Sequence, residues 1–232
     1  MLIELVVFDM AGTTVKDKNF VGAAFQQAMK SHGYDIAIQD VNPLMGYEKP
    51  LAIRMMLETR EPNKDKITDE LISEIHSHFV NGMIQFYSTT QEIGPLPNVE
   101  ETFATLRDAG VKIALNTGFS RDIADVIIDR LGWSDKIDCL VASDEVAYCR
   151  PYPDMINKIM EELHISSAAN VAKVGDTEVD INEGINARCK FVIGITTGAF
   201  TADDLLPYKP THIINDIAEV IRIVSETPAY VA

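Results

Sequence analysis

The chain has 232 residues, of which 47% are hydrophobic and 24% charged, and its formal net charge at pH 7 is −15. This length suits one large domain, or one domain with a smaller insert, and it is sufficient for a core without disulfides or structural metals. The negative charge disfavours binding to nucleic acid or to anionic membranes, so neither is expected as a partner. An anionic substrate would need a local positive site.

The three cysteines, Cys139, Cys149 and Cys189, form neither a disulfide framework nor a metal-ligand pattern, which favours a reducing compartment. The first residues lack the basic segment and the small-residue cleavage site of a signal peptide. No apolar run is long enough to cross a bilayer. The sequence therefore predicts a cytoplasmic protein.

Short apolar runs recur along the chain, and each ends in polar or glycine-rich residues. Continuous apolar runs are typical of strands that are buried on both faces, as in a parallel sheet. Helical spacing lies between them, and this alternation predicts an α/β fold with a doubly wound, mostly parallel, Rossmann-like sheet. The predicted strands are residues 3–8, 111–115, 137–141, 171–174, 191–195 and 212–214; the predicted helices are residues 99–109, 121–131, 154–163 and 179–187.

The segment from residue 18 to residue 92 interrupts this alternation. It contains no convincing strand, and apolar residues recur at helical spacing, with Phe20, Ala24 and Ala28 on one face and Leu51 and Met55 on another. The stretch Gly-Pro-Leu-Pro at 94–97 is typical of a linker. We therefore expect an inserted helical cap at 18–92 and a core formed by 1–17 and 93–232.

Four polar groups follow predicted strands. Asp9, Thr117 with Gly118, Arg150 and Asp176 each come after an apolar run, and ligands of open parallel sheets bind beyond the carboxyl ends of the strands. Taken singly, each has an ordinary structural role: an aspartate after a strand is usually a turn former or helix cap, and an arginine is usually a surface group. Their joint occurrence predicts a common site.

These groups suit chemistry at phosphorus. Two carboxylates and a backbone carbonyl are ligands that Mg²⁺ prefers, and the metal would neutralise a bound anion. The Asp9 carboxylate could then act as a nucleophile. The Arg150 guanidinium could grip the anion, and the Thr117 hydroxyl could donate to the same oxygens, together with neighbouring backbone N–H groups.

Four segments resemble the signature motifs of the haloacid dehalogenase superfamily. The resemblance implies that Asp9 is the nucleophile, that Thr117 binds phosphate, and that Asp9 and Asp176 hold the metal, with Asp180 and Thr13 close behind. The segments are FDMAGTT at 8–14, LNTGF at 115–119, CRPYPD at 149–154 and VGDTEVD at 174–180.

Two departures narrow the resemblance. Most phosphatases of the superfamily carry a second aspartate two residues after the nucleophile, where this chain has Ala11. Alanine cannot protonate a leaving oxygen, so ester hydrolysis would lose a contribution of about 10²–10⁴-fold, although the Ala11 carbonyl can still bind the metal. The third motif carries Arg150 where lysine is usual. Both features are similar to phosphonoacetaldehyde hydrolases, the phosphonatase-like subgroup.

That subgroup uses a cap lysine, which forms a Schiff base with the substrate aldehyde. The segment MGYEK at 45–49 resembles the motif that carries this lysine, which implies Lys49 as the catalytic amine and Met45 as a substrate contact. A helix beginning near Lys49 would favour the neutral amine, whereas without the motif a solvated surface lysine is the ordinary interpretation. This chain has Ala52 and Phe119 where the subgroup has histidine and tyrosine.

Three functions are compatible with these observations. The first is Mg²⁺-dependent hydrolysis of the C–P bond of a small phosphonate, through an aspartyl-phosphate and a Lys49 Schiff base. The second is a phosphatase or phosphotransferase that acts on a small phosphate ester. The third is a non-catalytic regulatory domain that binds phosphate or metal. Phosphonatases pair through their caps, so the resemblance also implies a homodimer.

Overall fold

A six-stranded, fully parallel sheet lies at the centre of the core. The computed structural model describes residues 3–225. The strand order is β3-β2-β1-β4-β5-β6, which confirms the predicted doubly wound α/β class. All six predicted strands are present, with ends that differ from the prediction by a few residues. They are β1 (Leu5–Asp9), β2 (Lys112–Thr117), β3 (Cys139–Ala142), β4 (Val171–Gly175), β5 (Phe191–Ile195) and β6 (His212–Ile214).

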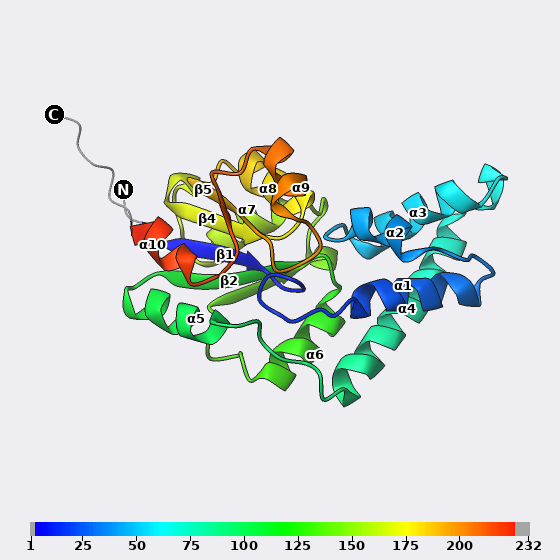
Figure 1. Ribbon diagram of the computed structural model, residues 1–232, viewed down its shortest axis with the longest axis horizontal. Helices are drawn as coiled ribbons and strands as arrows, with labels where there is room; N and C mark the ends of the chain where they lie inside the picture. The colour runs from blue at the N-terminus through cyan, green and yellow to red at the C-terminus, as the bar shows by residue number, and fades with distance from the viewer. Residues whose placement is uncertain (1–2, 226–232) are drawn as a thin grey trace.

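Helices cover both faces of the sheet (Figure 1). On one face lie α5 (Val99–Asp108), α6 (Arg121–Leu131) and α10 (Glu219–Ser225), and on the other lie α7 (Asp154–Glu162), α8 (Glu178–Asn186) and α9 (Ala202–Leu205). The central strand β1 supplies both layers, because Val6 and Phe8 pack on the α5 side and Leu5 and Val7 on the α7 side. The sequence predicted four of these helices; α9 and α10 were not predicted.

Four helices lie between β1 and α5, to the right of the sheet in Figure 1. The two long helices α1 and α4 pack against each other through the rings of Phe25 and Phe79, whose centroids are 4.5 Å apart. Arg130 of α6 donates to the backbone carbonyls of Tyr87 and Thr90 and so ties the end of α4 to the core. The helices are α1 (Phe20–Ser31), α2 (Ile38–Val41), α3 (Lys49–Arg60) and α4 (Asp69–Thr89).

The buried faces of α1 and α3 differ from the predicted ones. In α3 the buried side chains include Ala52, Ile53, Met56 and Leu57, whereas Leu51 and Met55 are only half-buried. In α1 the buried positions include Val21 and Phe25, while Phe20 and Ala24 are half-buried and Ala28 is buried. Each helix carries two adjacent apolar stripes, and packing against α4 selects the one that faces it.

Two neighbouring segments, residues 14–16 and 94–96, connect the sheet to the helical insert. The Lys16 N–H donates to the Gly94 carbonyl and the Leu96 N–H donates to the Thr14 carbonyl, both at 3.0 Å. The two connections between the sheet and the helical insert are therefore held side by side. Within residues 3–225, no helix is both long enough and apolar enough to span a membrane.

Candidate active site

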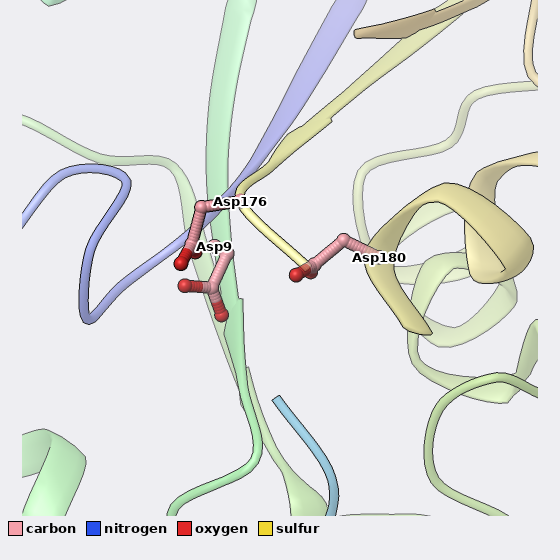
Figure 2. Close-up of side chains that lie close together, drawn as sticks. All are labelled: Asp9, Asp176 and Asp180. Carbon is pink, nitrogen blue, oxygen red and sulfur yellow. The ribbon is translucent and has the colours of Figure 1, made fainter. Parts of the chain in front are cut away.

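The strand order reverses at β1, which has β2 on one side and β4 on the other. Asp9 is the last residue of β1, and Asp176 follows the last residue of β4. Ligands of doubly wound sheets bind at this reversal, beyond the carboxyl ends of the strands. Figure 2 shows the Asp9 and Asp176 carboxylates side by side, with Asp180 reaching toward them from α8.

Three buried carboxylates meet at this point. One oxygen from each of Asp9, Asp176 and Asp180 lies within 4.8 Å of the others. The Thr13 hydroxyl donates to Asp176 Oδ1 at 3.0 Å, and the Ala199 N–H donates to Oδ2 at 2.7 Å. Burial raises the pKa of Asp176 well above its usual range, and the neighbouring charges of Asp9 and Asp180 raise it further.

Asp180 is fixed by the start of α8. Its Oδ2 accepts from the Thr177 hydroxyl at 2.5 Å and from the Thr177 N–H at 3.3 Å, which is a reciprocal helix cap. Its Oδ1 lies 3.0 Å from both Arg150 and Lys173. Burial acts to raise the pKa of Asp180, but the two cations outweigh burial and lower it. Asp180 is therefore held as a buried carboxylate that supports the other two.

Arg150 lies beneath the nucleophile candidate, and its side chain is fully buried. Its guanidinium is 2.7 Å from Asp9 Oδ1 and 3.4 Å from Glu183, and it donates to the Asn116 carbonyl at 2.7 Å. Burial acts to lower the pKa of Arg150, but Asp180, Asp9 and Glu183 outweigh it and raise the pKa. The guanidinium thus faces these protein groups, and it lies behind Asp9 rather than along the wall of the cavity described below.

The sequence analysis missed three members of this network, namely Lys173, Glu183 and Asn116. Lys173 Nζ lies 3.0 Å from Glu183 and 2.6 Å from Asn116 Oδ1, and the Asn116 amide donates to Glu183 at 2.8 Å. All three are completely buried. A lysine inside the apolar run of β4 was the available signal, because a charge in a buried strand requires partners.

Burial raises the pKa of Asp9, and the Arg150 charge opposes this rise. When the Lys49 amine is neutral, two cations face four buried carboxylates, which leaves two negative charges without a counter-ion. A divalent cation with a preference for oxygen ligands fits this deficit. Asp9 and Asp176 would hold Mg²⁺, with the backbone carbonyl of Ala11, which lines the same cavity as both. These three residues are the predicted metal ligands, and they line one cavity.

Lys49 is the first residue of α3 and is only 4% exposed, so it is not the solvated surface lysine of the ordinary interpretation. Its Nζ donates to the Tyr47 carbonyl at 3.1 Å and lies 5.0 Å from the ring centroid of Phe119 and 5.7 Å from that of Phe25. Burial and then the Arg150 charge lower the pKa of Lys49 to about 8. Ala52, one turn further along α3, is completely buried and supplies no polar group.

One small cavity brings the amine and the carboxylates together. It encloses about 20 Å³, which is room for about one water molecule. Of the predicted common site, Asp9, Asp176, Thr117 and Gly118 line it, whereas Arg150 does not; Lys49 and Met45, which the resemblance implied, line it as well. A larger cavity of about 240 Å³ adjoins it, and Ala11, Met45 and Asp176 line both. The Thr117 hydroxyl accepts from the Phe119 N–H at 3.1 Å and keeps its own proton for a ligand.

The fold and the buried acidic centre define a class of α/β hydrolase, and comparison with known proteins identifies it. Residues 3–188 match the family model of the haloacid dehalogenase-like hydrolases. The chain belongs to this family.

Relatives and solved structures refine the comparison. A phosphonoacetaldehyde hydrolase from Bacteroides fragilis is 30% identical over 99% of this chain and 95% of its own length. A bifunctional phosphonoacetaldehyde hydrolase/aminoethylphosphonate transaminase from Clostridioides difficile is 35% identical over 80% of this chain, which spans only 30% of that protein. The structure of a phosphonoacetaldehyde hydrolase-like protein from Oleispira antarctica superposes with a TM-score of 0.80 over 98% of this chain and 96% of its own, at 22% identity, which supports the fold.

The buried ionic network should be essential for stability. Lys173→Met leaves Asp180 and Glu183 short of a partner, so the free energy of unfolding should fall by about 3–5 kcal/mol. Urea denaturation measures this change. The control is Lys18→Met, which removes a solvent-exposed ion pair with Glu92 and should change the free energy by less than about 1 kcal/mol. If both variants changed the free energy of unfolding equally, Lys173 would not be an essential member of the buried ionic network.

Mg²⁺ should stabilise the protein through Asp176. At a concentration of about 100 times its dissociation constant it adds about 2.7 kcal/mol, which raises Tm by several degrees. Differential scanning fluorimetry measures the shift, and chelation should reverse it. Asp176→Asn should abolish the shift, whereas Asp203→Asn, which alters an exposed acid, should preserve it. An unchanged shift in Asp176→Asn would place the metal elsewhere.

The Lys49 amine should titrate at a far lower pH than the amines of ordinary lysines. Because its pKa is lowered to about 8, the neutral fraction should increase up to pH 8 and level off above pH 9. Exposed lysines titrate near pH 10.4. Competitive acetylation followed by mass spectrometry gives the midpoint for each lysine peptide. A Lys49 labelling rate that still rises several-fold between pH 9 and pH 10, as it should for an exposed lysine, would be inconsistent with the buried environment.

Proposed function

We propose that the chain hydrolyses the C–P bond of a small phosphonate that carries an aldehyde or ketone next to the phosphonomethyl carbon. The observation that carries this proposal is the small cavity that both Lys49 and Asp9 line. The relatives at about 30% identity are named phosphonoacetaldehyde hydrolases, which supports the same chemistry. Ala11 offers no acid for an alkoxide leaving group, and this reaction needs none.

The reaction begins at the substrate carbonyl. The neutral Lys49 amine adds to the carbonyl carbon to give a carbinolamine. This intermediate takes up a proton and loses water, which gives a protonated imine. The lowered pKa of Lys49 supports this step, because a substantial fraction of the amine is unprotonated near neutral pH. The Tyr47 carbonyl accepts from Nζ at 3.1 Å and orients the amine.

The second step breaks the bond to phosphorus. An Asp9 carboxylate oxygen bonds to phosphorus while the C–P bond breaks, and the electron pair of that bond moves into the iminium to give a neutral enamine. Arg150, at 2.7 Å from Asp9, favours the ionised nucleophile. The Thr117 hydroxyl and the backbone N–H groups of its loop can donate to the phosphoryl oxygens. Mg²⁺ held by Asp9 and Asp176 would neutralise the charge of the phosphoryl group.

Two hydrolyses complete the cycle. A proton is added to the enamine carbon, and water then cleaves the resulting imine to release the aldehyde or ketone and restore Lys49. Water attacks the aspartyl-phosphate, releases inorganic phosphate and restores Asp9. The rings of Phe25 and Phe119, which face Nζ, cannot transfer a proton. Asp9, Asp17, Cys149 and His76 interact electrostatically with the amine, so one of these groups or solvent supplies the proton.

The apolar surroundings of the amine favour a second candidate function. An enzyme with Asp9, Thr117 and Asp176, but with apolar Ala52 and Phe119 in the cap and the cavity, could act on a small phosphate ester, provided that its leaving group needs no acid from position 11. Such a phosphatase or phosphotransferase would use the same aspartyl-phosphate. Membership of a hydrolase family disfavours the non-catalytic alternative.

We assign residues 18–92 to the cap and the flanking residues to the core, because the described helices of the insert fall between Phe20 and Thr89. A homodimer through the caps is part of the same proposal. A cavity of about 400 Å³ between α1 and α4, lined by Ala23, Ala24 and Gly82, lies on the cap surface where such pairing could occur.

The proposal is tested by measuring phosphate release by the wild type, Asp9→Asn and Lys49→Arg. The substrates are phosphonoacetaldehyde and an aryl phosphate. Asp9→Asn should lower release at least about 10⁴-fold for every substrate, because it removes the nucleophile. Lys49→Arg should abolish release from phosphonoacetaldehyde and spare the aryl phosphate. A colorimetric phosphate assay measures both rates.

Borohydride separates the two candidate functions. In the presence of phosphonoacetaldehyde, reduction should inactivate the wild-type enzyme and add the reduced substrate carbon chain to the Lys49 peptide. Ester hydrolysis without any such adduct would instead favour the phosphatase, and phosphate release by Lys49→Arg from the phosphonate would rule out the imine.

A further inference from the structure

A chain of three polar side chains links the cap segment 45–49 to the core. The Tyr47 hydroxyl donates to Glu178 Oε1 at 2.8 Å. The Tyr208 hydroxyl donates to the other carboxylate oxygen of Glu178. Tyr47 belongs to the cap, whereas Glu178 and Tyr208 belong to the core, and all three are half-buried. The side chains of these three residues have no part in the chemistry proposed above.

The cap segment lies directly on the core at this place. Gly46 has a φ of +87°, and a Cβ there would come within 2.3 Å of the Thr177 hydroxyl. A Cβ on Gly118 would come within 2.7 Å of the Tyr47 carbonyl oxygen. Only glycines permit so close an approach at both positions. The backbone of the cap segment therefore forms the roof of the cavity above Thr117 and Asp9.

Tyr47 connects this contact to the amine. Its side chain is held by Glu178, and its backbone carbonyl accepts the hydrogen bond from Lys49 Nζ at 3.1 Å. A displacement of Tyr47 would therefore carry the acceptor of the amine with it. Phe119 and Phe25 make only ring contacts with Nζ, which do not fix its direction as a hydrogen bond does.

Glu178 is well placed to act as the anchor. It is the first residue of α8, where the positive end of the helix dipole stabilises a carboxylate. The same helix start fixes Asp180 through Thr177. Hydrogen bonds to a carboxylate are stronger than bonds between neutral groups. One helix terminus thus holds both a carboxylate of the acidic centre and the cap segment that bears the amine.

We propose that Glu178 and Tyr208 are positioning residues, which hold Tyr47 and through its carbonyl the Lys49 amine over the cavity. The cavity that the cap segment roofs has a volume of about 20 Å³, so a small displacement of this segment changes the position of the amine relative to Asp9. The role in imine formation rests on the proposed function. The attachment of the cap segment to Glu178 does not.

Hydrogen–deuterium exchange of the full-length protein tests the attachment without substrate. In Tyr47→Phe and Glu178→Gln, the amides of residues 44–49 should exchange about 10-fold faster than in the wild type, since a charge-assisted hydrogen bond is lost. The matched control is Tyr34→Phe, which removes a tyrosine–carboxylate bond to Glu61 elsewhere in the cap and should leave these amides unchanged. Unaltered exchange in both test variants would overturn the proposal.

Borohydride trapping with phosphonoacetaldehyde tests the positioning of the amine. The rate of Lys49 adduct formation should fall about 10-fold in Tyr47→Phe and about threefold in Tyr208→Phe, and should be unchanged in Tyr34→Phe. The rise in Tm caused by Mg²⁺ with beryllium fluoride, which reports the Asp9 side of the site, should keep its wild-type value in all three. A loss of that rise would indicate general damage to the site and contradict a positioning role.

The two readouts separate the possible failures. If the wild-type protein forms no adduct with phosphonoacetaldehyde, the proposed function fails, and hydrogen exchange alone decides whether Glu178 holds the cap segment. If the wild type forms the adduct and Tyr47→Phe forms it at the same rate, the proposed function survives and the positioning role of Glu178 is wrong.

Discussion

The ion pair between Arg150 and Asp9 is the interaction on which the site depends. A carboxylate at the end of a buried strand is unfavourable when it is charged, and burial raises the pKa of Asp9. The buried guanidinium at 2.7 Å counteracts that tendency, and it also balances Asp180 and Glu183. Because Arg150 and Lys173 leave two negative charges unbalanced when Lys49 is neutral, the same network creates the demand for a divalent cation.

The fold places carboxylates on one side of a cavity and an amine on the other. The reversal of strand order places Asp9 and Asp176 side by side, although they are far apart in the sequence. The inserted helices bring Lys49 from the other side, in apolar surroundings that lower its pKa. The core thus supplies anions held by buried cations, and the cap supplies an amine whose proton is easily lost. The contact of Tyr47 with Glu178 joins these two halves.

Much of this arrangement was predictable from local sequence. Parallel strands such as β4 are buried on both faces and so appear in the sequence as continuous apolar runs. Because ligands of such sheets bind beyond the carboxyl ends of the strands, Asp9 and Asp176 were expected to lie together. Lys173 and Glu183 were missed because they pair with each other across β4 and α8 and with groups on β2 and on the loop before α7, so only the folded network explains them. The burial of Lys49 was undecided because it depends on Phe25 and Phe119. The choice between adjacent apolar stripes on α3 likewise required its packing against α4.

The central claim is that Asp9 bonds to phosphorus, and rapid acid quench with mass spectrometry tests it most directly. Acid preserves acyl phosphates for long enough to digest the protein and locate the adduct. During turnover with Mg²⁺ and a substrate that releases phosphate, a phosphoryl group should appear on the peptide that contains Asp9. It should form and decay at least as fast as the overall reaction. Phosphate release with no adduct on that peptide, or with an adduct on another residue, would contradict the account.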